Sequence, residues 1–343
     1  MDYRKLGNSG TSVSHLALGT MTFGAEADEK ASHAILADYA DAGGNLIDTA
    51  DVYTHGVSEE IIGRWLARNP SRRERMVLAS KGRFPMGDDV NDLGLSRRHL
   101  RRALDASLTR LGVDHVDLYQ VHSWDPSTPL EETLGFLNEA VVRGDIGYYG
   151  FSNFTGWQLT KAHQMALHRG YSLPVTLQPQ YSLLVREIEA EIVPAVLDAG
   201  MGMLPWSPLG GGWLTGKYTR DTQPAGATRL GEDPQRGMEG WEKRNAEERT
   251  WGIIETVADI ATGRGVTAAQ IALAWVAAQP AVSSVILGAR SQEQLADNLA
   301  SATISLSSDE LVRLDDASAP TFGDYPYGGP GLDQRSRRLD GGR

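Results

Sequence analysis

The feature that most constrains the fold is an alternation, repeated along most of the chain, of short apolar runs with longer amphipathic segments. Eight runs are short and rich in aliphatic residues, which is typical of strands buried on both faces. The predicted strands are His15–Leu18, Asn45–Ile47, Met76–Ser80, Val116–Val121, Ile146–Phe151, Val175–Gln178, Met201–Pro205 and Ser284–Leu287. The predicted helices between them include Ala31–Ala42, the segment that opens at Ser58, Ser96–Leu111, Pro129–Val142, Gly156–His168 and Ile188–Ala199. Strands and helices that alternate eight times within 343 residues predict an α/β fold, a (β/α)8 TIM barrel.

A doubly wound parallel sheet is the competing α/β architecture. In its dinucleotide-binding form, the turn after the first strand carries the glycine pattern GxGxxG. Here the first predicted strand is followed by Gly19-Thr20-Met21-Thr22-Phe23-Gly24, which does not fit that pattern. The sequence therefore favours the barrel.

Three segments depart from the alternation. Residues 1–14 carry Gly7-Asn8-Ser9-Gly10 between short runs, which predicts a β-hairpin ahead of the barrel. Residues 208–249 form a long Gly/Pro-rich loop after the seventh strand, which we expect to be a lid over the open end of the barrel. Its aromatic residues contact substrate or anchor the loop; they are Trp213, Tyr218 and Trp241. Residues 317–343 form a Gly/Pro-rich tail that we expect to be loosely ordered, and no boundary divides residues 1–343 into separate domains.

Composition excludes several functional classes. The chain has 33 Lys and Arg against 44 Asp and Glu, a net charge of −11, which argues against binding to nucleic acid or to an anionic membrane. It has no cysteine, so disulfides, thiolate metal sites and a cysteine nucleophile are excluded. No apolar stretch approaches the roughly 18 residues of a membrane span, and the first residues lack the apolar core of a signal peptide. We expect a cytoplasmic protein, monomeric or homo-oligomeric.

Polar side chains stand at the ends of three predicted strands. Asp48 directly follows the second predicted strand, Lys81 the third and His122 the fourth, and Tyr53 lies on the loop after Asp48. In a (β/α)8 barrel, the residues at the carboxyl ends of the strands point into one pocket. We therefore expect these four side chains to meet.

The chemistry of this set is coherent. A phenol is a poor acid near neutral pH, and an ammonium within hydrogen-bond reach stabilises its phenolate and lowers its pKa. The sequence predicts that Tyr53 donates a proton, that Lys81 and Asp48 tune its pKa, and that His122 orients a carbonyl oxygen. Protonation of a developing alkoxide matches hydride delivery to a carbonyl carbon.

A metal-dependent barrel hydrolase is one alternative. The His and Asp residues show no HxH or HExxH spacing, and the charge of Lys81 would repel a cation, so we expect no metal site.

Seven stretches in order make the chain resemble the aldo-keto reductases, over nearly its whole length from Leu6 to Asn298. The bacterial members and the potassium-channel β-subunits are the most similar. The stretches are Asp48-Thr49-Ala50-Asp51-Val52-Tyr53, Lys81-Gly82, Gln120-Val121-His122, Gly150-Phe151-Ser152-Asn153, Gln178-Pro179-Gln180-Tyr181-Ser182-Leu183-Leu184, Trp206-Ser207-Pro208-Leu209 with Thr215-Gly216-Lys217-Tyr218, and Gly288-Ala289-Arg290 with Gln294 and Asn298.

The resemblance implies roles for individual residues. Asp48, Tyr53, Lys81 and His122 match the catalytic tetrad of the family. The residues matching its NADPH site are Gly19, Thr20, Met21, Asp48, Ser152, Asn153, Gln178, Trp206, Ser207, Pro208, Leu209, Gly210, Lys217, Arg229, Gly288, Arg290, Gln294, Asp297 and Asn298. Beside Tyr53 and His122, the expected substrate contacts are Phe23, Trp124 and Tyr181.

Two functions follow from the resemblance. The first is NADPH-dependent reduction of a small-molecule aldehyde or ketone, reversible through the same residues. The alternative is an NADPH-binding redox-sensing subunit with little turnover. Arg290, beside a helix start that Ser291 can cap, favours a 2′-phosphate and so NADPH over NADH.

Overall fold

The computed structural model describes residues 1–226, 229–232, 234 and 239–336. Eight parallel strands form one sheet in the order β10-β3-β4-β5-β6-β7-β8-β9. Their bounds are β3 Leu16–Gly19, β4 Leu46–Asp48, β5 Val77–Gly82, β6 Val116–Val121, β7 Ile146–Ser152, β8 Thr176–Gln178, β9 Gly202–Met203 and β10 Val285–Gly288. The predicted strands are all confirmed.

The two outer strands of this sheet meet and close it. The amide of Met203 donates to the carbonyl of Ala281 (2.6 Å), and the amide of Ser283 donates to the carbonyl of Met203 (2.9 Å). Further along, the amide of Ile286 donates to the carbonyl of Pro205 (3.0 Å). The predicted (β/α)8 barrel is therefore confirmed.

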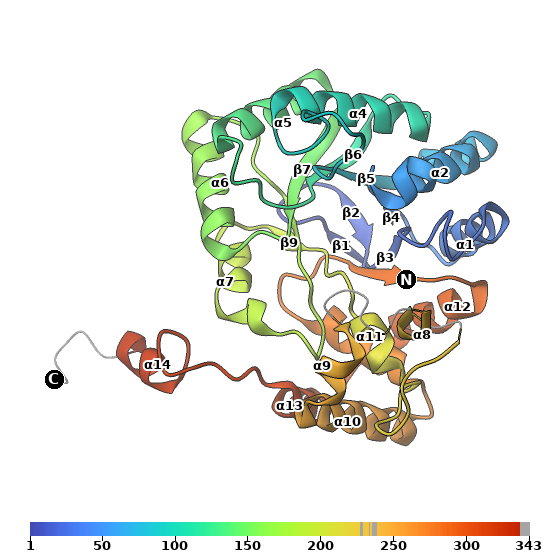
Figure 1. Cartoon of the computed structure of the whole chain (residues 1–343), viewed down its shortest axis with the longest axis vertical. Helices are drawn as coiled ribbons and strands as arrows, with labels where there is room; N and C mark the ends of the chain where they lie inside the picture. Colours follow the sequence, from blue (N-terminus) through green and yellow to red (C-terminus); the bar gives the residue numbers. More distant parts are fainter. Residues whose placement is uncertain (227–228, 233, 235–238, 337–343) are drawn as a thin grey trace.

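Helices surround the strands (Figure 1). The longer ones are α1 Glu29–Asp41, α2 Val57–Arg68, α4 Arg97–Leu111, α5 Leu130–Arg143, α6 Gly156–Arg169, α7 Ile192–Asp198, α10 Glu248–Arg264, α11 Ala268–Ala278, α12 Gln292–Ala300 and α13 Ser308–Ser318. Short helices are α3 Pro70–Arg73, α8 Arg229–Glu232 and α9 Trp241–Asn245, and 3₁₀ turns cover Tyr53–Gly56, Glu187–Ala190, Gly210–Thr215 and Ser301–Thr303. The local sequence sets the ends, as in α4, where the Ser96 hydroxyl caps the first turn and Gly112 ends the helix with φ 65°.

One predicted helix begins later than expected. Ile188–Ala199 was predicted to be continuous, but Glu187–Ala190 is a 3₁₀ turn and α7 begins at Ile192. Pro194 explains the difference, because its ring and missing N–H are tolerated in the first turn of a helix but not in its interior.

The predicted hairpin is confirmed and packs against the barrel interior. β1 Tyr3–Lys5 pairs antiparallel with β2 Ser12–Ser14. Leu6 and Val13 are fully buried in a cluster with inward-facing strand residues, among them Leu46, Ala79 and Leu118. The hairpin therefore contributes apolar side chains to the core inside the barrel.

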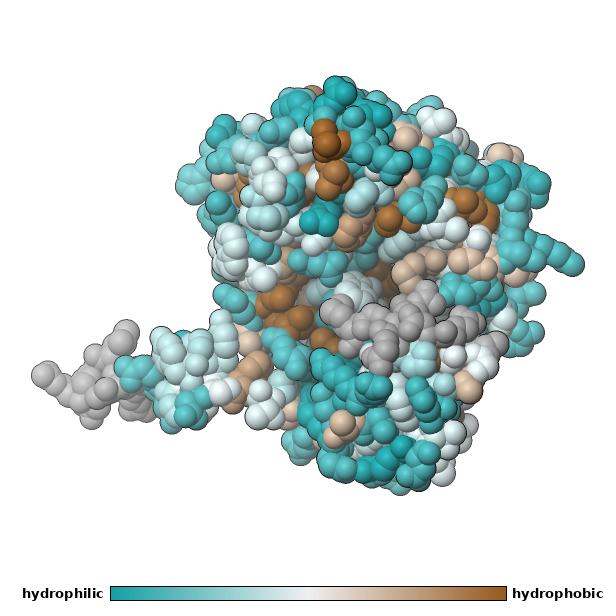
Figure 2. All heavy atoms as spheres, viewed as in Figure 1, coloured by the Kyte–Doolittle hydropathy of each residue, from teal (hydrophilic) through white to brown (hydrophobic). Residues whose placement is uncertain are grey.

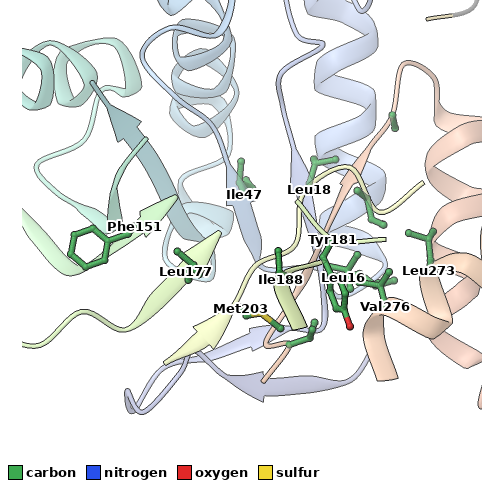
Figure 3. Close-up of a cluster of buried hydrophobic side chains, with 14 of the residues drawn as sticks. Leu16, Leu18, Ile47, Phe151, Leu177, Tyr181, Ile188, Met203, Leu273 and Val276 are labelled. Carbon is green, nitrogen blue, oxygen red and sulfur yellow. The ribbon is translucent and has the colours of Figure 1, made fainter. Parts of the chain in front are cut away.

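The alternation of side chains along the strands separates two cores. The alternate residues Leu16, Leu18, Ile47, Phe151 and Leu177 belong to a larger cluster that also includes side chains from the surrounding helices (Figure 3). The inward positions are apolar early in the strands and polar at their carboxyl ends. Leu46 is thus followed two residues later by Asp48, Ala79 by Lys81, and Leu118 by Gln120.

The long segment after β9 is anchored by aromatic side chains. The ring of Trp213, fully buried, stacks on that of Trp241 (centroids 5.0 Å apart) and contacts Tyr218 and Trp251 edge-on. Of the two roles expected for these aromatic residues, the structure therefore supports anchoring. Part of the predicted lid, residues 227, 228, 233 and 235–238, lies outside the described residues.

The C-terminal tail contains a helix that its composition did not predict. α14 covers Gly329–Ser336 and lies away from the barrel, beyond an extended stretch that follows α13 (Figure 1). Residues 337–343 of the predicted tail lie outside the described part. Within the described residues, no helix has the length and hydropathy needed to cross a bilayer.

Candidate active site

Lys81 is the centre of a buried hydrogen-bond network at the carboxyl ends of the strands. Its side chain comes from β5 and is 0% exposed. Its ammonium donates to Asp48 Oδ2 (2.6 Å), to the carbonyl of Thr49 (2.9 Å) and to the hydroxyl of Tyr53 (3.1 Å). These three acceptors match the three donors of an ammonium group.

Asp48 links the ammonium to two further strands. Its Oδ1 accepts from the side-chain amides of Gln178 in β8 (2.8 Å) and Gln120 in β6 (3.3 Å). Its carboxylate is therefore fixed by donors on both oxygens. Such a buried charge is tolerated when it is paired and hydrogen-bonded.

Tyr53 reaches the network from a tight turn after β4. It opens a 3₁₀ turn in which Thr54 and His55 have left-handed backbone conformations, with φ 50° and 51°. Such conformations are costly for residues other than glycine and concentrate at functional sites. The Thr54 hydroxyl donates to the carbonyl of Phe23 (2.9 Å), which ties the turn to the loop after β3.

Charge and burial act in opposite directions on the two titrating groups. Burial lowers the pKa of Lys81, but Asp48 and Tyr53 outweigh it, so that pKa lies above its ordinary value. Burial raises the pKa of the Tyr53 phenol, while the Lys81 ammonium lowers it, and burial prevails. The sequence predicted the direction of the ammonium's effect, but the net lowering expected for Tyr53 is wrong for the protein alone.

His122 lies beside the phenol and is neutral. Its ring meets the Tyr53 ring edge-on (centroids 5.9 Å apart) and the Phe84 ring in the same manner (4.7 Å). Burial, with the charges of Lys81 and Arg83, lowers the pKa of its imidazole from 6.5 to about 2. Its Nδ1 is buried without a hydrogen-bond partner among the described residues.

Four of the residues that match the family's NADPH site, Ser152, Asn153, Gln178 and Trp206, lie at or just after the ends of the neighbouring strands. Asn153 has φ 56°, donates to the carbonyl of His122 (3.0 Å) and accepts from the Trp206 indole (3.1 Å). The Ser152 hydroxyl donates to the carbonyl of Gln178 (2.9 Å). The structure therefore brings these four residues together with His122 at one end of the barrel.

Other residues that match the family's NADPH site follow β9 and β10. After Trp206, Ser207 and Gly210 have positive φ values of 54° and 55°, and Pro208 and Leu209 lie between them. The Lys217 ammonium lies over the Tyr218 ring, 5.0 Å from its centroid. The side chain of Arg229 is outside the described part of the structure.

The start of α12 combines an exposed glycine with a capped first turn. Gly288 ends β10, is exposed, and has open space where a side chain would stand. The Ser291 hydroxyl caps α12, and the amide of Arg290 donates to Gln294 Oε1 (2.9 Å). The Asn298 amide donates to the carbonyl of Gly288 (3.1 Å). Exposed amides at a helix start favour anions.

Some of the predicted ligand residues have structural partners within the chain. Phe23 and Tyr181 are 0% and 2% exposed and belong to the hydrophobic core (Figure 3 shows Tyr181), and the substrate contacts expected of them stay predictions. The Tyr181 hydroxyl donates to Glu189 (2.6 Å). The carboxylate of Asp297 accepts from Gln270 (2.7 Å), which fixes it against α11.

Of the three predicted cofactor residues at the end of β3 and just after it, two contact neighbouring strands and one is exposed. Gly19 pairs with Gly288 and Asp48 across the neighbouring strands. The hydroxyl of Thr20 donates to the carbonyl of Asp48 (3.0 Å), so it holds β4 in place. Met21 is exposed and remains accessible to a ligand.

Sequence reasoning missed several residues at this site. Gln120 lies two residues before His122, so the period of a strand already placed the two side chains on one face. Arg83 and Phe84 follow β5, and Trp157 lies in the first turn of α6. No local pattern in the sequence indicated that these three side chains lie near His122 or Trp124. Among the described residues, no group of three or more potential ligands could hold a metal ion.

Comparisons with known proteins agree with this fold. The family model described as "Aldo/keto reductase family" matches residues 15–319. An uncharacterized oxidoreductase, YrpG, of Bacillus subtilis is 39% identical over 95% of this chain and 98% of its own. A probable voltage-gated potassium channel subunit beta of Oryza sativa is 38% identical over 87% of this chain and 90% of its own. Versiconal hemiacetal acetate reductase of Aspergillus parasiticus is 32% identical over 93% of this chain and 98% of its own.

The chain belongs to the aldo/keto reductase family. The resemblance stated from the motifs, including the likeness to bacterial members and channel subunits, is confirmed. The family and its oxidoreductase-named relatives support an oxidoreductase that acts on carbonyl compounds in general, and members of the family typically bind NAD(P)H.

Proposed function

We propose that this protein is an NADPH-dependent reductase of aldehydes or ketones. The observation that carries the proposal is the buried contact of the Lys81 ammonium with both Asp48 (2.6 Å) and the Tyr53 hydroxyl (3.1 Å), beside a neutral His122. This arrangement supplies a proton to an oxygen that is gaining negative charge. These residues do not form the set of ligands that a metal ion needs, as none of the described residues do.

The residues at the strand ends fit a nicotinamide dinucleotide. Ser152, Asn153 and Gln178 offer polar groups beside Trp206, whose ring gives a flat surface. The capped start of α12, with Arg290 and the open backbone at Gly288, suits a phosphate-bearing adenosine. When bound, the nicotinamide supplies the hydride.

The protein's own groups then act on the carbonyl oxygen. The neutral imidazole of His122 donates a hydrogen bond to it and fixes its position. The hydroxyl of Tyr53 gives its proton to the oxygen as charge develops there. Lys81 stabilises the phenolate that remains, and Asp48 holds the ammonium in place. In the reverse direction, the phenolate accepts the proton of an alcohol.

Cofactor choice follows from Arg290. A guanidinium binds a phosphate group by paired charge-assisted hydrogen bonds, which the 2′-phosphate of NADPH offers and NADH lacks. We propose NADPH as the preferred cofactor for this reason.

Replacement of Tyr53 tests the proposal. Tyr53→Phe is expected to lower kcat for NADPH oxidation with benzaldehyde by about 10²- to 10⁴-fold, the usual contribution of a general acid. The dissociation constant of NADPH, followed by quenching of tryptophan fluorescence, should change little. Tyr325→Phe, which makes the same change at an exposed tyrosine of the tail, is the matched control. Unchanged turnover in Tyr53→Phe would show that another group provides the proton.

A redox-sensing subunit with little turnover is the second candidate. The similarity to the rice protein named as a channel β-subunit favours it, because 87% of this chain is covered at 38% identity. The two candidates differ in rate under the same assay. A sensor would bind NADPH tightly and turn over rarely with any carbonyl substrate, whereas a reductase falls within typical enzyme values of about 1–10³ s⁻¹.

A further inference from the structure

Arg83 is a partly buried cation beside the proposed catalytic centre. It directly follows β5, two residues after Lys81. Its guanidinium lies over the ring of Phe84 (4.9 Å from the centroid), and the same ring contacts that of His122 (4.7 Å). Its Nη2 donates to the carbonyl of Trp124 (3.2 Å). Arg83 is thus held at the rim of the site by two loops.

Among the described residues, no carboxylate forms an ion pair with the guanidinium of Arg83, although its charge is one of the causes that lower the pKa of nearby Asp125. Its Nε is buried and has no hydrogen-bond partner among the described residues. Asp125 is close in sequence to Trp124, but its oxygens accept from the amides of Leu95 (2.9 Å) and Ser127 (2.8 Å) and from the hydroxyl of Thr128 (2.6 Å). Since Arg83 is only half-buried and has no carboxylate in direct contact, the accessible part of its guanidinium can pair with a negative group of a ligand.

The charge acts at the reaction centre. Arg83 is one of the groups that lower the pKa of the His122 imidazole, after burial and Lys81. It therefore lies close enough to interact with a molecule whose carbonyl oxygen faces His122 and Tyr53.

Aromatic rings surround the same rim. The ring of Trp124 contacts the ring of Trp157 edge-on (centroids 5.4 Å apart), and it also contacts the buried ring of Phe154. Trp157, at the outer end of this row of three rings, is 54% exposed. The face shown in Figure 2 is hollowed near its centre, where hydrophobic side chains gather. Flat apolar surface next to a single cation suits a ligand with an aromatic body and one negative group.

We propose that Arg83 binds a carboxylate of the substrate, so that the preferred substrates are aromatic aldehydes or ketones bearing a carboxylate. This inference rests on the proposed carbonyl reduction and adds its substrate class. The planar guanidinium can pair with both oxygens of a carboxylate, which a lysine cannot do in the same geometry.

The test compares each carboxylated aldehyde with its own methyl ester. The probes are 2-, 3- and 4-formylbenzoate and the corresponding methyl esters, assayed with NADPH. In the native protein, at least one formylbenzoate should have a kcat/KM about 10- to 100-fold above that of its ester, the range expected for a charge-assisted hydrogen bond. In Arg83→Gln and Arg83→Met, the ratio should fall to about one. Because the ratio is taken within each variant, a general loss of activity cancels.

Two further variants control for charge and for folding. Arg83→Lys keeps the charge but loses the planar donor pair, so part of the preference should remain. Arg313→Gln removes an arginine from α13, where it pairs with Asp259 at the surface, and should leave the ratio unchanged. A preference that is absent from the native protein, or that persists in both Arg83→Gln and Arg83→Met, overturns the proposal.

A binding measurement separates this inference from the proposed function. Benzoate cannot be reduced, so its binding to the NADP⁺-loaded protein, followed by calorimetry, does not depend on turnover. If no aldehyde is reduced but benzoate binds the native protein at least 10-fold more tightly than Arg83→Gln, the carboxylate site stands and the reductase proposal falls. Equal benzoate affinity in the two proteins refutes the carboxylate site.

Discussion

Removal of the charge of Asp48 should expose how strongly the buried centre depends on pairing. Asp48→Asn keeps the size and shape of the side chain and leaves an oxygen to accept from Gln178, but it places a neutral amide where the Lys81 ammonium now lies 2.6 Å from a carboxylate oxygen. The two side chains are 3% and 0% exposed, so water cannot replace the lost charge. Breaking a buried ion pair on one side typically costs about 3–5 kcal/mol. That is a large part of the roughly 5–15 kcal/mol that stabilises an ordinary fold.

The pH dependence of this loss has a definite sign. In the native protein, burial alone would lower the pKa of Lys81, but Asp48 and Tyr53 raise it above its ordinary value. In Asp48→Asn, burial prevails and the pKa falls. The unfolded chain then binds more protons than the folded chain between this lowered pKa and about 10.5, so the stability of the variant rises with pH in that window. The deficit should be smaller at pH 9.5 than at pH 7.

Urea unfolding followed by tryptophan fluorescence measures both effects. A double-mutant cycle with Lys81→Met isolates the pair, because each single change leaves one buried group without its partner and the double change leaves neither charge. We expect a coupling free energy of roughly 2–3 kcal/mol, at the upper end of the range for residues in contact. Additive changes, within about 0.5 kcal/mol, would refute the idea that the two groups stabilise each other.

Three other perturbations follow from the structure. Burial and the charge of Glu59 raise the pKa of Asp51 from 3.8 to about 7, so the folded chain retains a proton that the unfolded chain releases, and stability falls between about pH 4 and pH 7. In Asp51→Asn, urea unfolding at pH 5 and pH 8 should show a fall that is smaller by up to about 2.5 kcal/mol, and an unchanged fall contradicts that assignment. Arg290→Ala should weaken NADPH binding by about 1.5–3 kcal/mol and NADH binding much less, as measured by fluorescence titration, whereas equal losses would show that Arg290 does not contact the 2′-phosphate. Trp213→Ala should lower the free energy of unfolding by about 3–5 kcal/mol, measured by urea unfolding, because the fully buried ring stacks on that of Trp241. A decrease in the free energy of unfolding below about 1 kcal/mol would contradict the anchoring role.

The fold was predictable because the barrel repeats a simple pattern. Short aliphatic runs indicated strands buried on both faces, and strand period placed Asp48, Lys81 and Gln120 on the inward side at the carboxyl ends. Helix boundaries were harder, since they depend on single residues such as Pro194, which delays the start of α7.

The site was predictable where it is built from strand ends and less so elsewhere. Tyr181 belongs to a motif of the family, but a motif gives a position and not the direction of a side chain, and this one faces the core. Arg83 and Trp124 belong to loops that are 41 residues apart, and nothing in either loop indicates the contact between them. The net effect on the pKa of Tyr53 depends on the depth of burial, which the sequence does not specify.

Transfer of deuterium from the cofactor to the product is the most direct test of the proposed chemistry. NADPH deuterated at the transferred position of C4 would be mixed with the native protein and an aromatic aldehyde, and the alcohol would be examined by mass spectrometry. We expect one deuterium on the former carbonyl carbon with the native protein, and no detectable alcohol in the same time with Tyr53→Phe although that variant still binds NADPH. An alcohol without deuterium, or equal transfer by the two proteins, would contradict reduction through Tyr53.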